Sequence, residues 1–494
     1  MTIALTGGTG FVGSHLLAEL LRRQQRVIAL VRGDTDRARL RLRRAVAATG
    51  LGAGVLEYLD GVPLVQADLE QPHLGLGIKE FRRLARRIDT IWHCAAHIDL
   101  DATETAAHRV NVTGTRRILQ LADACLRPPH VVYISTVFVA GCRPSGTVGE
   151  DDLDDSHGFV NSYERSKYAT EVLIRDWAST RATKVTVLRP SVLVTSRPPV
   201  ARGPRHPHAV VSSRLASHGP HWLARQAGQT LPAPGVLAAR IAVGPQAVIN
   251  VLPVEYAAAA MVRLASATHP GGTRTHHVVH PTDTPARACV LASAAHLPWL
   301  EVTPVPDLPD PTPAEKLLEQ LASIAVGYRM TGRRYDRRTL DAADAAAGVT
   351  PPPPLTPAYL AATFDPGSVL SMPPAERMPT STATPTAGTL ICTTPKATPR
   401  ENAVPPPRPI PGRRPVYEML TRLLTEEFDI PAEGITPQAT VRDLELDSLT
   451  LVELTVMVAE QTGKTIETED LTLDSTLAEI ADKFTTVPAD VPTA

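Results

Sequence analysis

The feature that most constrains this fold is a glycine-rich loop near the amino terminus. Gly7, Gly10 and Gly13 occur in the run TGGTGFVG, after the apolar run Ile3–Leu5 and before Phe11–Leu21, which has helical spacing. A strand, a tight glycine turn and a helix in this order let the backbone approach a pyrophosphate, whose charge the helix terminus favours. Similar glycine spacing occurs in ordinary turns, so the inference depends on the flanking segments. The loop predicts a dinucleotide-binding fold.

Strand-like and helical segments alternate through the first two hundred residues. The expected strands are Ile3–Leu5, Val27–Val31, Thr90–His93, Val131–Ile134 and Val185–Leu188, and the expected helices are 11–21, 79–88, 113–126 and 163–178. This alternation is typical of a parallel sheet that is covered by helices on both faces. We therefore expect an α/β fold with a Rossmann-type, doubly wound parallel sheet.

The carboxy-terminal part differs in composition. Residues 366–414 are rich in proline, serine, threonine and alanine, which is typical of an extended, semi-rigid linker. Amphipathic helical patterns follow at Val416–Glu427, Ser448–Gln461 and Leu477–Phe484. The 494 residues thus divide into a body (1–365), a linker (366–414), a small all-helical unit (415–485) and a short tail (486–494) expected to be disordered.

The net charge of −1 conceals an uneven distribution. Residues 415–485 contain 4 Lys+Arg and 16 Asp+Glu, whereas residues 1–414 contain 46 and 34. Opposite charges favour docking of the helical unit on the body, an attraction that salt weakens. A solvated acidic face with no docking role is the alternative. The basic residues are scattered and lack interleaved aromatic residues, so we expect no nucleic-acid partner.

Several other signals exclude alternatives. The five cysteines form no CxxC pair, which fits a reduced, cytoplasmic protein. No apolar run is long enough to cross a bilayer, and the start lacks the basic segment of a signal peptide. A histidine group in a proline-interrupted stretch lacks metal-ligand spacing, so we expect a surface loop or substrate lid there and no metal. These histidines are His206, His208, His218 and His221.

Tyr163 and Lys167 are four residues apart within an expected helix, so both side chains lie on one face. An ammonium beside a phenol lowers the pKa of the tyrosine and makes proton exchange feasible near neutral pH. The same spacing is common on ordinary helix surfaces. Thr136, at the end of the strand 131–134, supplies a hydroxyl that could hold a carbonyl oxygen.

Arg32 ends the second expected strand, about twenty residues after the glycine loop. An acidic residue near this position commonly binds the ribose of NADH, whereas an arginine suits the 2′-phosphate of NADPH. Arg39 or Arg41 could assist. A surface arginine is the alternative, and the sequence favours NADPH.

Further motifs carry a resemblance to a known family. They are TGGTGFVG at 6–13, Asp68-Leu69 with LGL at 74–76, HCAA at 93–96, NVTGT at 111–115, Ser135-Thr136, Arg189-Pro190 and NVLPVEY at 250–256. Residues 1–365 resemble extended short-chain dehydrogenases/reductases, specifically the branch of thioester reductases and fatty acyl-CoA reductases. Glu255 replaces the usual aspartate of the last motif. Residues 197–240, which vary among such proteins, are unusually rich in Pro, Arg and His.

The resemblance implies a role for each matching residue. Tyr163 would be the proton donor, Lys167 its pKa partner and ribose contact, and Thr136 a hydrogen-bond donor to the oxyanion. Asn111 would support the active-site water or helix, and Asp68 the adenine. The cofactor would contact Gly7, Thr9, Gly10, Phe11, Gly13, Arg32, Asp68, Leu69, Ala95, Asn111, Lys167 and Pro190. A small substrate-binding subdomain would include the variable region 197–240.

Asp447-Ser448-Leu449 begins an amphipathic helix in the acidic unit. A serine hydroxyl at a helix terminus suits an incoming phosphate, although an N-cap serine is the simpler alternative. With its flanking leucines, the unit resembles a four-helix acyl or peptidyl carrier protein, which implies that Ser448 bears 4′-phosphopantetheine. The acidic residues Asp443, Glu445, Asp447, Glu453 and Glu460 would face partner enzymes, with Arg202, Arg205, Arg214 and Arg225 as a receiving surface.

Together these features predict NADPH-dependent reduction of a carrier-bound acyl thioester, in secondary-metabolite or lipid biosynthesis. The product is an aldehyde, with further reduction to the alcohol left open. A separate acyl-loading ligase or synthase and a phosphopantetheinyl transferase are the implied partners, and no membrane is expected. The alternatives are a ketoreductase or epimerase acting on a chain that stays on the carrier, and a non-catalytic docking module.

Overall fold

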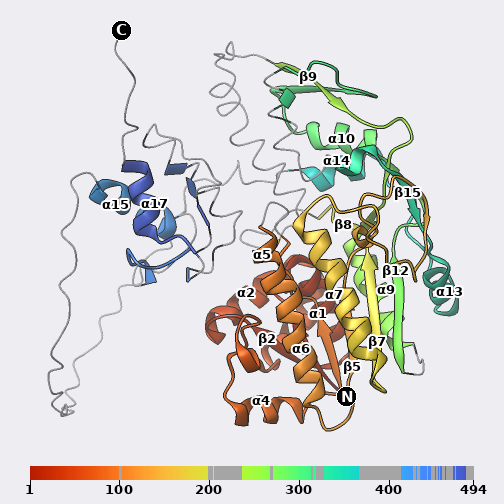
Figure 1. The fold of residues 1–494 in the computed structure, drawn as a ribbon, viewed down its shortest axis with the longest axis vertical. Helices are drawn as coiled ribbons and strands as arrows, with labels where there is room; N and C mark the ends of the chain where they lie inside the picture. Colours follow the sequence, from red (N-terminus) through yellow and green to blue (C-terminus); the bar gives the residue numbers. More distant parts are fainter. Residues whose placement is uncertain are drawn as a thin grey trace. The chain divides into compact units, whose positions relative to one another are not determined.

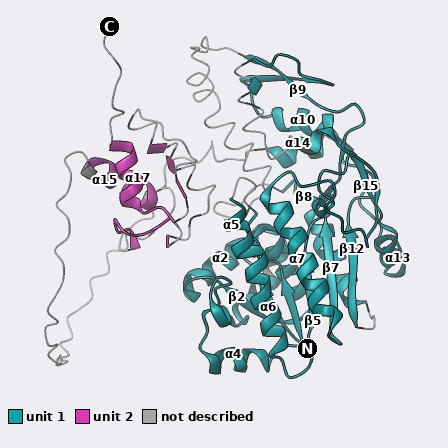
Figure 2. Ribbon diagram, in the orientation of Figure 1, with its two compact units in different colours: residues 1–374 teal, residues 375–494 magenta. Residues whose placement is uncertain are grey.

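The computed structural model describes residues 1–98, 103–197, 204, 236–267, 271–312, 315–316, 318, 327–365, 413–426 and a discontinuous set between 430 and 485. The chain divides into two compact units, residues 1–374 and 375–494 (Figure 2). Each unit is described by itself below. None of the described helices has the length and hydrophobicity needed to cross a bilayer.

A seven-stranded sheet forms the centre of the first unit. Its strands are β1 (Thr2–Thr6), β2 (Arg26–Val31), β3 (Leu64–Gln66), β4 (Thr90–His93), β5 (His130–Ile134), β7 (Lys184–Pro190) and β12 (Gly272–Val278). They lie in the order β12-β7-β5-β4-β1-β2-β3, and every pairing is parallel. The expected doubly wound parallel sheet is confirmed. The strand order reverses between β1 and β4, which is where such sheets bind nucleotides.

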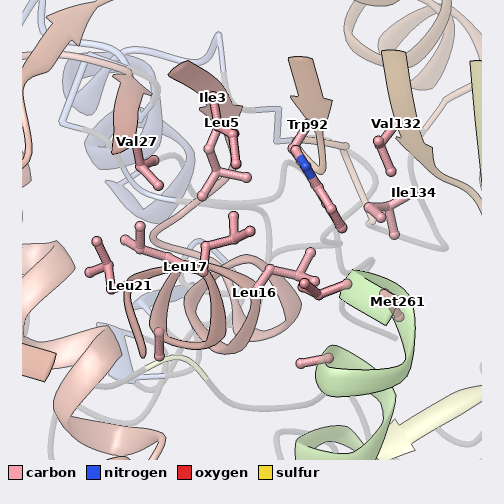
Figure 3. Close-up of a cluster of buried hydrophobic side chains, with 14 of the residues drawn as sticks. Ile3, Leu5, Leu16, Leu17, Leu21, Val27, Trp92, Val132, Ile134 and Met261 are labelled. Atoms are coloured by element: carbon pink, nitrogen blue, oxygen red, sulfur yellow. The ribbon is translucent and has the colours of Figure 1, made fainter. Parts of the chain in front are cut away.

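Helices cover both faces of the sheet (Figure 1). One face packs α1 (Phe11–Arg22), α2 (Thr35–Ala48), α3 (Gly52–Asp60) and α9 (Val254–Ser266), and the other packs α4 (Ile78–Ala85), α6 (Gly114–Asp123) and α7 (Ser162–Ser179). Alternate residues of β1 serve the two cores, since Ile3 and Leu5 belong to one and Ala4 to the other. Figure 3 shows Leu16 and Leu17 of α1 beneath the sheet, on the face that carries Ile3 and Leu5.

The helices and strands expected in the first two hundred residues are present, with small shifts in their ends. Two sheet strands, β3 and β12, were not expected from the sequence. The first has only three residues, and the second reads GTRTHHV, which lacks an apolar run although its last four residues are buried. In β12, Thr275 accepts a hydrogen bond from Arg175, and His277 is hydrogen-bonded to the Asp336 carbonyl oxygen. Hydrophobicity alone therefore does not predict this strand.

Smaller elements form the rest of this unit. The parallel pairs are β8 (Val192–Val194) with β11 (Val251–Pro253), β9 (Leu237–Ala242) with β14 (Leu300–Val305), and β6 (Ser145–Val148) with β15 (Gly332–Tyr335). The antiparallel pair is β10 (Val248–Ile249) with β13 (Thr284–Pro285). Further helices are α5 (Glu104–Ala107), α10 (Ala286–Ala294), α13 (Arg338–Ala346) and α14 (Pro357–Phe364). Figure 1 shows β9, α10 and α14 beyond the carboxyl ends of the sheet strands.

The second unit contains α15 (Arg413–Glu426) and α17 (Leu477–Thr485). They share an apolar core that includes Leu420, Leu424, Leu477 and Ile480. Leu451, Leu454 and Val458 of the expected middle helix also lie in this core, at the three- and four-residue spacing of an amphipathic helix. We expected four helices in this unit. The residues that would form the rest of them lie outside the described part of the chain.

Candidate active site

The glycine loop joins β1 to α1 at the carboxyl edge of the sheet. A Cβ atom on Gly13 would lie 1.9 Å from the Gly7 carbonyl oxygen, and one on Gly7, at φ +74°, would lie 2.6 Å from the Ala95 nitrogen. Only glycine therefore fits either position. A Cβ on Gly10 would meet only the Gly7 oxygen, at 3.4 Å. This turn, followed directly by the amino terminus of α1, fits the pyrophosphate of a dinucleotide.

A buried hydrogen-bond chain holds this loop against the neighbouring strand. Thr6 Oγ1 lies 2.8 Å from His93 Nδ1, and His93 Nε2 lies 2.9 Å from Thr115 Oγ1. Thr115 donates to the Asn111 carbonyl oxygen, and the Ala95 amide donates to Thr6. Burial lowers the pKa of His93 to about 3, so its ring is neutral. The ring thus donates from Nε2 and accepts at Nδ1, which sequence reasoning missed.

Arg32 and Asp68 follow β2 and β3, so both lie at the edge of the sheet that carries the glycine loop. Arg32 is exposed, and its carbonyl oxygen accepts a hydrogen bond from Arg41 Nη2 at 2.7 Å. Arg39 instead donates to the Leu59 carbonyl oxygen in α3. Asp68 is half-buried, and the following Leu69 packs so near Gly114 that a Cβ there would approach its side chain to 3.1 Å.

The structure brings Thr136, Tyr163 and Lys167 together. Tyr163 and Lys167 lie on one face of α7, with Lys167 Nζ 5.9 Å from the centroid of the Tyr163 ring. Lys167 Nζ donates to the Ile134 carbonyl oxygen at 2.8 Å, which fixes it beside the end of β5. Thr136 follows that strand, and its side chain is hydrogen-bonded to Tyr163. Two hydroxyls and an ammonium therefore meet at the carboxyl edge of the sheet.

The ionisation of this group differs from the sequence expectation. Burial raises the pKa of Tyr163, and Cys94 and Glu164 raise it further, while the hydrogen bond with Thr136 acts against them. We expected Lys167 to lower the pKa of Tyr163, but it is not one of the groups that shift it. Burial also lowers the pKa of Lys167 to about 8. At neutral pH, Tyr163 is thus a protonated phenol, as a proton donor requires.

Asn111 lies in a π-helical turn, His108–Thr113, of the kind often found at functional sites. Its amide nitrogen donates to Ser166 Oγ at 2.8 Å and to the His97 carbonyl oxygen at 3.0 Å, and its oxygen accepts from the His97 amide at 2.7 Å. Asn111 therefore clamps the segment after β4 onto α7. This position supports the helix role expected for it.

Two buried charged residues lie next to this site, and the sequence analysis expected no catalytic or binding role for either. Glu171 of α7 and Arg189 of β7 are both fully buried and pair at 2.7 Å. Glu171 is four residues after Lys167, so its position on the same helix face was detectable in the sequence. Arg189 directly precedes Pro190, the last residue of β7.

Several expected site residues lie outside the described part of the chain. In the carrier unit they are Ser448 and the acidic residues Glu445, Asp447, Glu453 and Glu460. In the variable region they are Arg202, Arg205, Arg214 and Arg225, together with the four histidines. The four described cysteines are free. Within the described ranges, no group of three or more histidine, cysteine or acidic residues has the arrangement of a metal site.

Known proteins share this architecture. The solved terminal R domain of the myxalamid PKS-NRPS pathway matches 75% of this chain and 91% of its own, at 27% identity and a TM-score of 0.57. The reductase domain of a nonribosomal peptide synthetase from Mycobacterium tuberculosis matches the fold at 22% identity and a TM-score of 0.56, over 74% of this chain and 91% of its own. These matches show a Rossmann-type fold of the kind found in reductase (R) domains.

The family follows from the sequence comparisons. The male sterility protein family matches residues 5–261, more than half of the chain, so the chain belongs to this family. The phosphopantetheine attachment site family matches residues 418–484. A carboxylic acid reductase from Segniliparus rugosus is 31% identical over 212 residues, which make up 40% of this chain and 18% of that protein. The chain spans less than a fifth of the length of such curated relatives.

Proposed function

We propose that this protein uses NADPH to reduce an acyl thioester on a phosphopantetheine arm, with release of an aldehyde. The observation that carries the proposal is the convergence of Thr136, Tyr163 and Lys167 next to a glycine cradle, on a chain that also has a phosphopantetheine attachment domain. A nicotinamide site and a carrier-bound acyl group on one chain favour reduction of the acyl group. The match to a carboxylic acid reductase supports the same chemistry.

The glycine loop, with Gly7, Gly10 and Gly13, would hold the pyrophosphate, and Asp68 and Leu69 would flank the adenine. Lys167 would contact the nicotinamide ribose. A nicotinamide held by these residues would supply a hydride to the thioester carbonyl carbon. The remaining steps depend on side chains of this protein.

Thr136 and Tyr163 would each donate a hydrogen bond to the carbonyl oxygen and stabilise its negative charge as the carbon becomes tetrahedral. Tyr163 then gives its proton to this oxygen, and Lys167 offsets the charge that forms on the phenolate. The resulting hemithioacetal then collapses: its hydroxyl proton returns to the Tyr163 phenolate, the carbon–sulfur bond breaks as the carbonyl re-forms, and the pantetheine leaves as a thiolate that takes up a proton from solvent. The aldehyde leaves, and a second round of reduction would give the alcohol.

The preference for NADPH rests on Arg32. Its position after β2 is where an acidic residue of NADH enzymes would bind the ribose hydroxyls, and its exposed guanidinium suits the extra 2′-phosphate. Arg41, which donates to the Arg32 carbonyl oxygen, is available to reinforce this charge.

We further propose that Ser448 carries the phosphopantetheine arm, whose thiol holds the acyl group as a thioester. A phosphopantetheinyl transferase would attach the arm, and a separate ligase or synthase would load it. The linker 366–414 keeps the carrier near the reductase and so raises the local substrate concentration. The charge difference between the two units favours their docking, and the arginines of the variable region remain the proposed receiving surface.

A test of this function uses the full-length protein converted to its holo form, loaded with a simple acyl group and given NADPH. Free aldehyde or alcohol, together with loss of the acyl mass from the protein, supports reductive release. A gain of two hydrogens on a chain that stays attached would instead establish a ketoreductase. Ser448→Ala should prevent loading and abolish this turnover, yet still reduce an acyl-pantetheine supplied in solution.

A further inference from the structure

A buried ion pair lies one helical turn beyond Lys167 on α7. Arg189 donates to Glu171 in a bidentate arrangement, from Nε to Oε1 at 2.9 Å and from Nη2 to Oε2 at 2.7 Å. Both side chains are fully buried. Placing two charges in the interior is costly unless each is well partnered, so a pair in this position calls for a physical explanation.

The partners of this pair come from several segments that meet at the active site. Ser135 Oγ donates to Glu171 Oε1 at 2.5 Å, and Ser135 immediately precedes Thr136. Arg189 Nη1 donates to the Glu150 carbonyl oxygen at 3.3 Å, and the Glu150 side chain accepts from the His277 amide at 3.0 Å. A single carboxylate thus ties α7 to the ends of β5 and β7, and the arginine extends the network to β12.

Glu171 is also one helical turn from Lys167 and acts on its charge. Burial lowers the pKa of Lys167, while Cys94 and Glu171 act in the opposite direction. Burial raises the pKa of the Cys94 thiol to about 11, so the thiol is uncharged at neutral pH. The carboxylate that supports the lysine ammonium near neutral pH is therefore that of Glu171.

The groups that face Lys167 come from four elements. Their protonation states show which of them carry a charge that could act on the lysine ammonium. Burial lowers the pKa of His93 to about 3 and raises that of Tyr133 well above its usual value, so both are neutral near pH 7. These groups are His93 and Cys94 at the end of β4, Tyr133 on β5, and Tyr163 and Glu171 on α7. Through Glu171 they also include Arg189 on β7 and Arg175 on α7, whose Nη2 lies 4.0 Å from Glu171 Oε2.

We propose that the Glu171–Arg189 pair is a positioning device for the active site: it fixes α7 against the sheet and keeps one negative charge behind the Lys167 ammonium. This role deepens the proposed function and rests on it, since Lys167 is the residue it supports. Arg189 prevents the carboxylate from swinging toward Lys167, and Ser135 links the same carboxylate to the strand end that bears Thr136. The ammonium thus keeps its place against the Ile134 carbonyl oxygen.

The test measures NADPH binding across pH by the fluorescence of the bound nicotinamide, which needs no thioester substrate. In the wild type, affinity should fall as pH rises through about 8, where Lys167 loses its proton. In Glu171→Gln this break should move to lower pH, by about one unit, because the carboxylate no longer supports the ammonium. Glu171→Gln/Arg189→Met, in which both charges are removed, should show the same shift and guards against misfolding of the single variant.

Asp344→Asn is the matched control. Asp344 is also buried and paired with Arg263 and Arg337, but these residues belong to α9, α13 and the segment before α13, and none acts on Lys167. In Asp344→Asn, NADPH affinity should fall at the same pH as in the wild type, even if the melting temperature of the variant is lower. A break that stays in place in both Glu171 variants, or is missing from the wild type, would overturn the proposal. A wild type with the break but no thioester reduction would refute the proposed function and leave this inference standing.

Discussion

The Lys167 ammonium donates a hydrogen bond to the carbonyl oxygen of Ile134, the last residue of β5, at 2.8 Å. Ile134 is two residues before Thr136. This contact therefore holds Lys167 of α7 close to the end of β5, where Thr136 follows. The lysine also lies 4.7 Å from the centroid of the Tyr133 ring, which gives its charge a second contact inside the fold. The site is therefore assembled by backbone and ring contacts.

Replacing Tyr163 with phenylalanine should lower thioester turnover by about 10²–10⁴-fold, because the proton donor to the carbonyl oxygen is lost. Cofactor affinity should stay at the wild-type value, since the glycine cradle and Lys167 are intact. Tyr168→Phe is the control on the same helix, where the ring packs 5.2 Å from Phe159. Rates from aldehyde release decide the matter, and equal rates for the two variants would remove Tyr163 from the mechanism.

Turnover should decline on the alkaline side of about pH 8. The protonated form of Lys167 is the active one, and its pKa of about 8 means that the ammonium is lost as pH rises through that value. Below it, Lys167 keeps its proton and this group should impose no further pH dependence. The pH dependence of kcat/KM measures this limb, because it reports the ionisation of the free enzyme. A rate that stays constant well beyond pH 8 would show that the lysine charge plays no part.

Gly13→Ala should abolish tight cofactor binding. The new methyl group would lie 1.9 Å from the Gly7 carbonyl oxygen, so the loop must shift out of the shape that receives a pyrophosphate. Gly54→Ala in α3 is the control, because its methyl group would meet nothing within 4 Å. That variant should bind normally and gain about 0.5–1 kcal/mol of stability. Calorimetric titration with NADPH separates them, and normal binding by Gly13→Ala would contradict the cradle.

Arg32→Ala should lower the preference for NADPH over NADH by about 10–100-fold, which corresponds to one charge-assisted hydrogen bond to the 2′-phosphate. Most of the change should appear in the KM for NADPH. Arg26→Ala is the control, because Arg26 is exposed at the opposite end of the same strand. The ratio of kcat/KM values for the two cofactors measures the effect. An unchanged ratio would assign the preference to another residue.

Leu17→Ala should destabilise the reductase unit by about 2–5 kcal/mol, because this fully buried side chain of α1 lies in the core next to β1. Leu40→Ala, on a side chain that is 55% exposed, should change the free energy of unfolding by less than about 0.5 kcal/mol. Denaturant unfolding of both variants gives the comparison. Similar losses in the two would mean that the contacts described for α1 do not hold the sheet.

The sequence predicted five of the seven sheet strands and the local elements that form the candidate site. The glycine loop, the strand Thr90–His93 and the helix carrying Tyr163 and Lys167 were all predicted, because each has a strong local pattern. Strand β12 was not, since its buried side chains include threonine and histidine. Such residues are stabilised by distant partners, and a local pattern does not contain that information.

The electrostatics of the site were the harder part to predict. The four-residue spacing gave the geometry of Tyr163 and Lys167 but not the direction of the tyrosine pKa, which burial raises. The partners of Glu171 and His93 were likewise hidden, since they are up to several dozen residues away in sequence. Spacing predicts which groups share a face, whereas their ionisation depends on how deeply the whole fold buries them.

The strand order has a consequence for how the protein is made. After β1, β2 and β3 have paired, each later sheet strand adds next to one already present: β4 on β1, β5 on β4, β7 on β5 and β12 on β7. From β5 onward, each new sheet strand covers the edge that the sheet strand before it left open, whereas β3 remains an edge strand. The sheet can therefore be built during translation, in the order in which the ribosome delivers it. Until residues 272–278 emerge, β7 remains an open edge to which another nascent chain could bind.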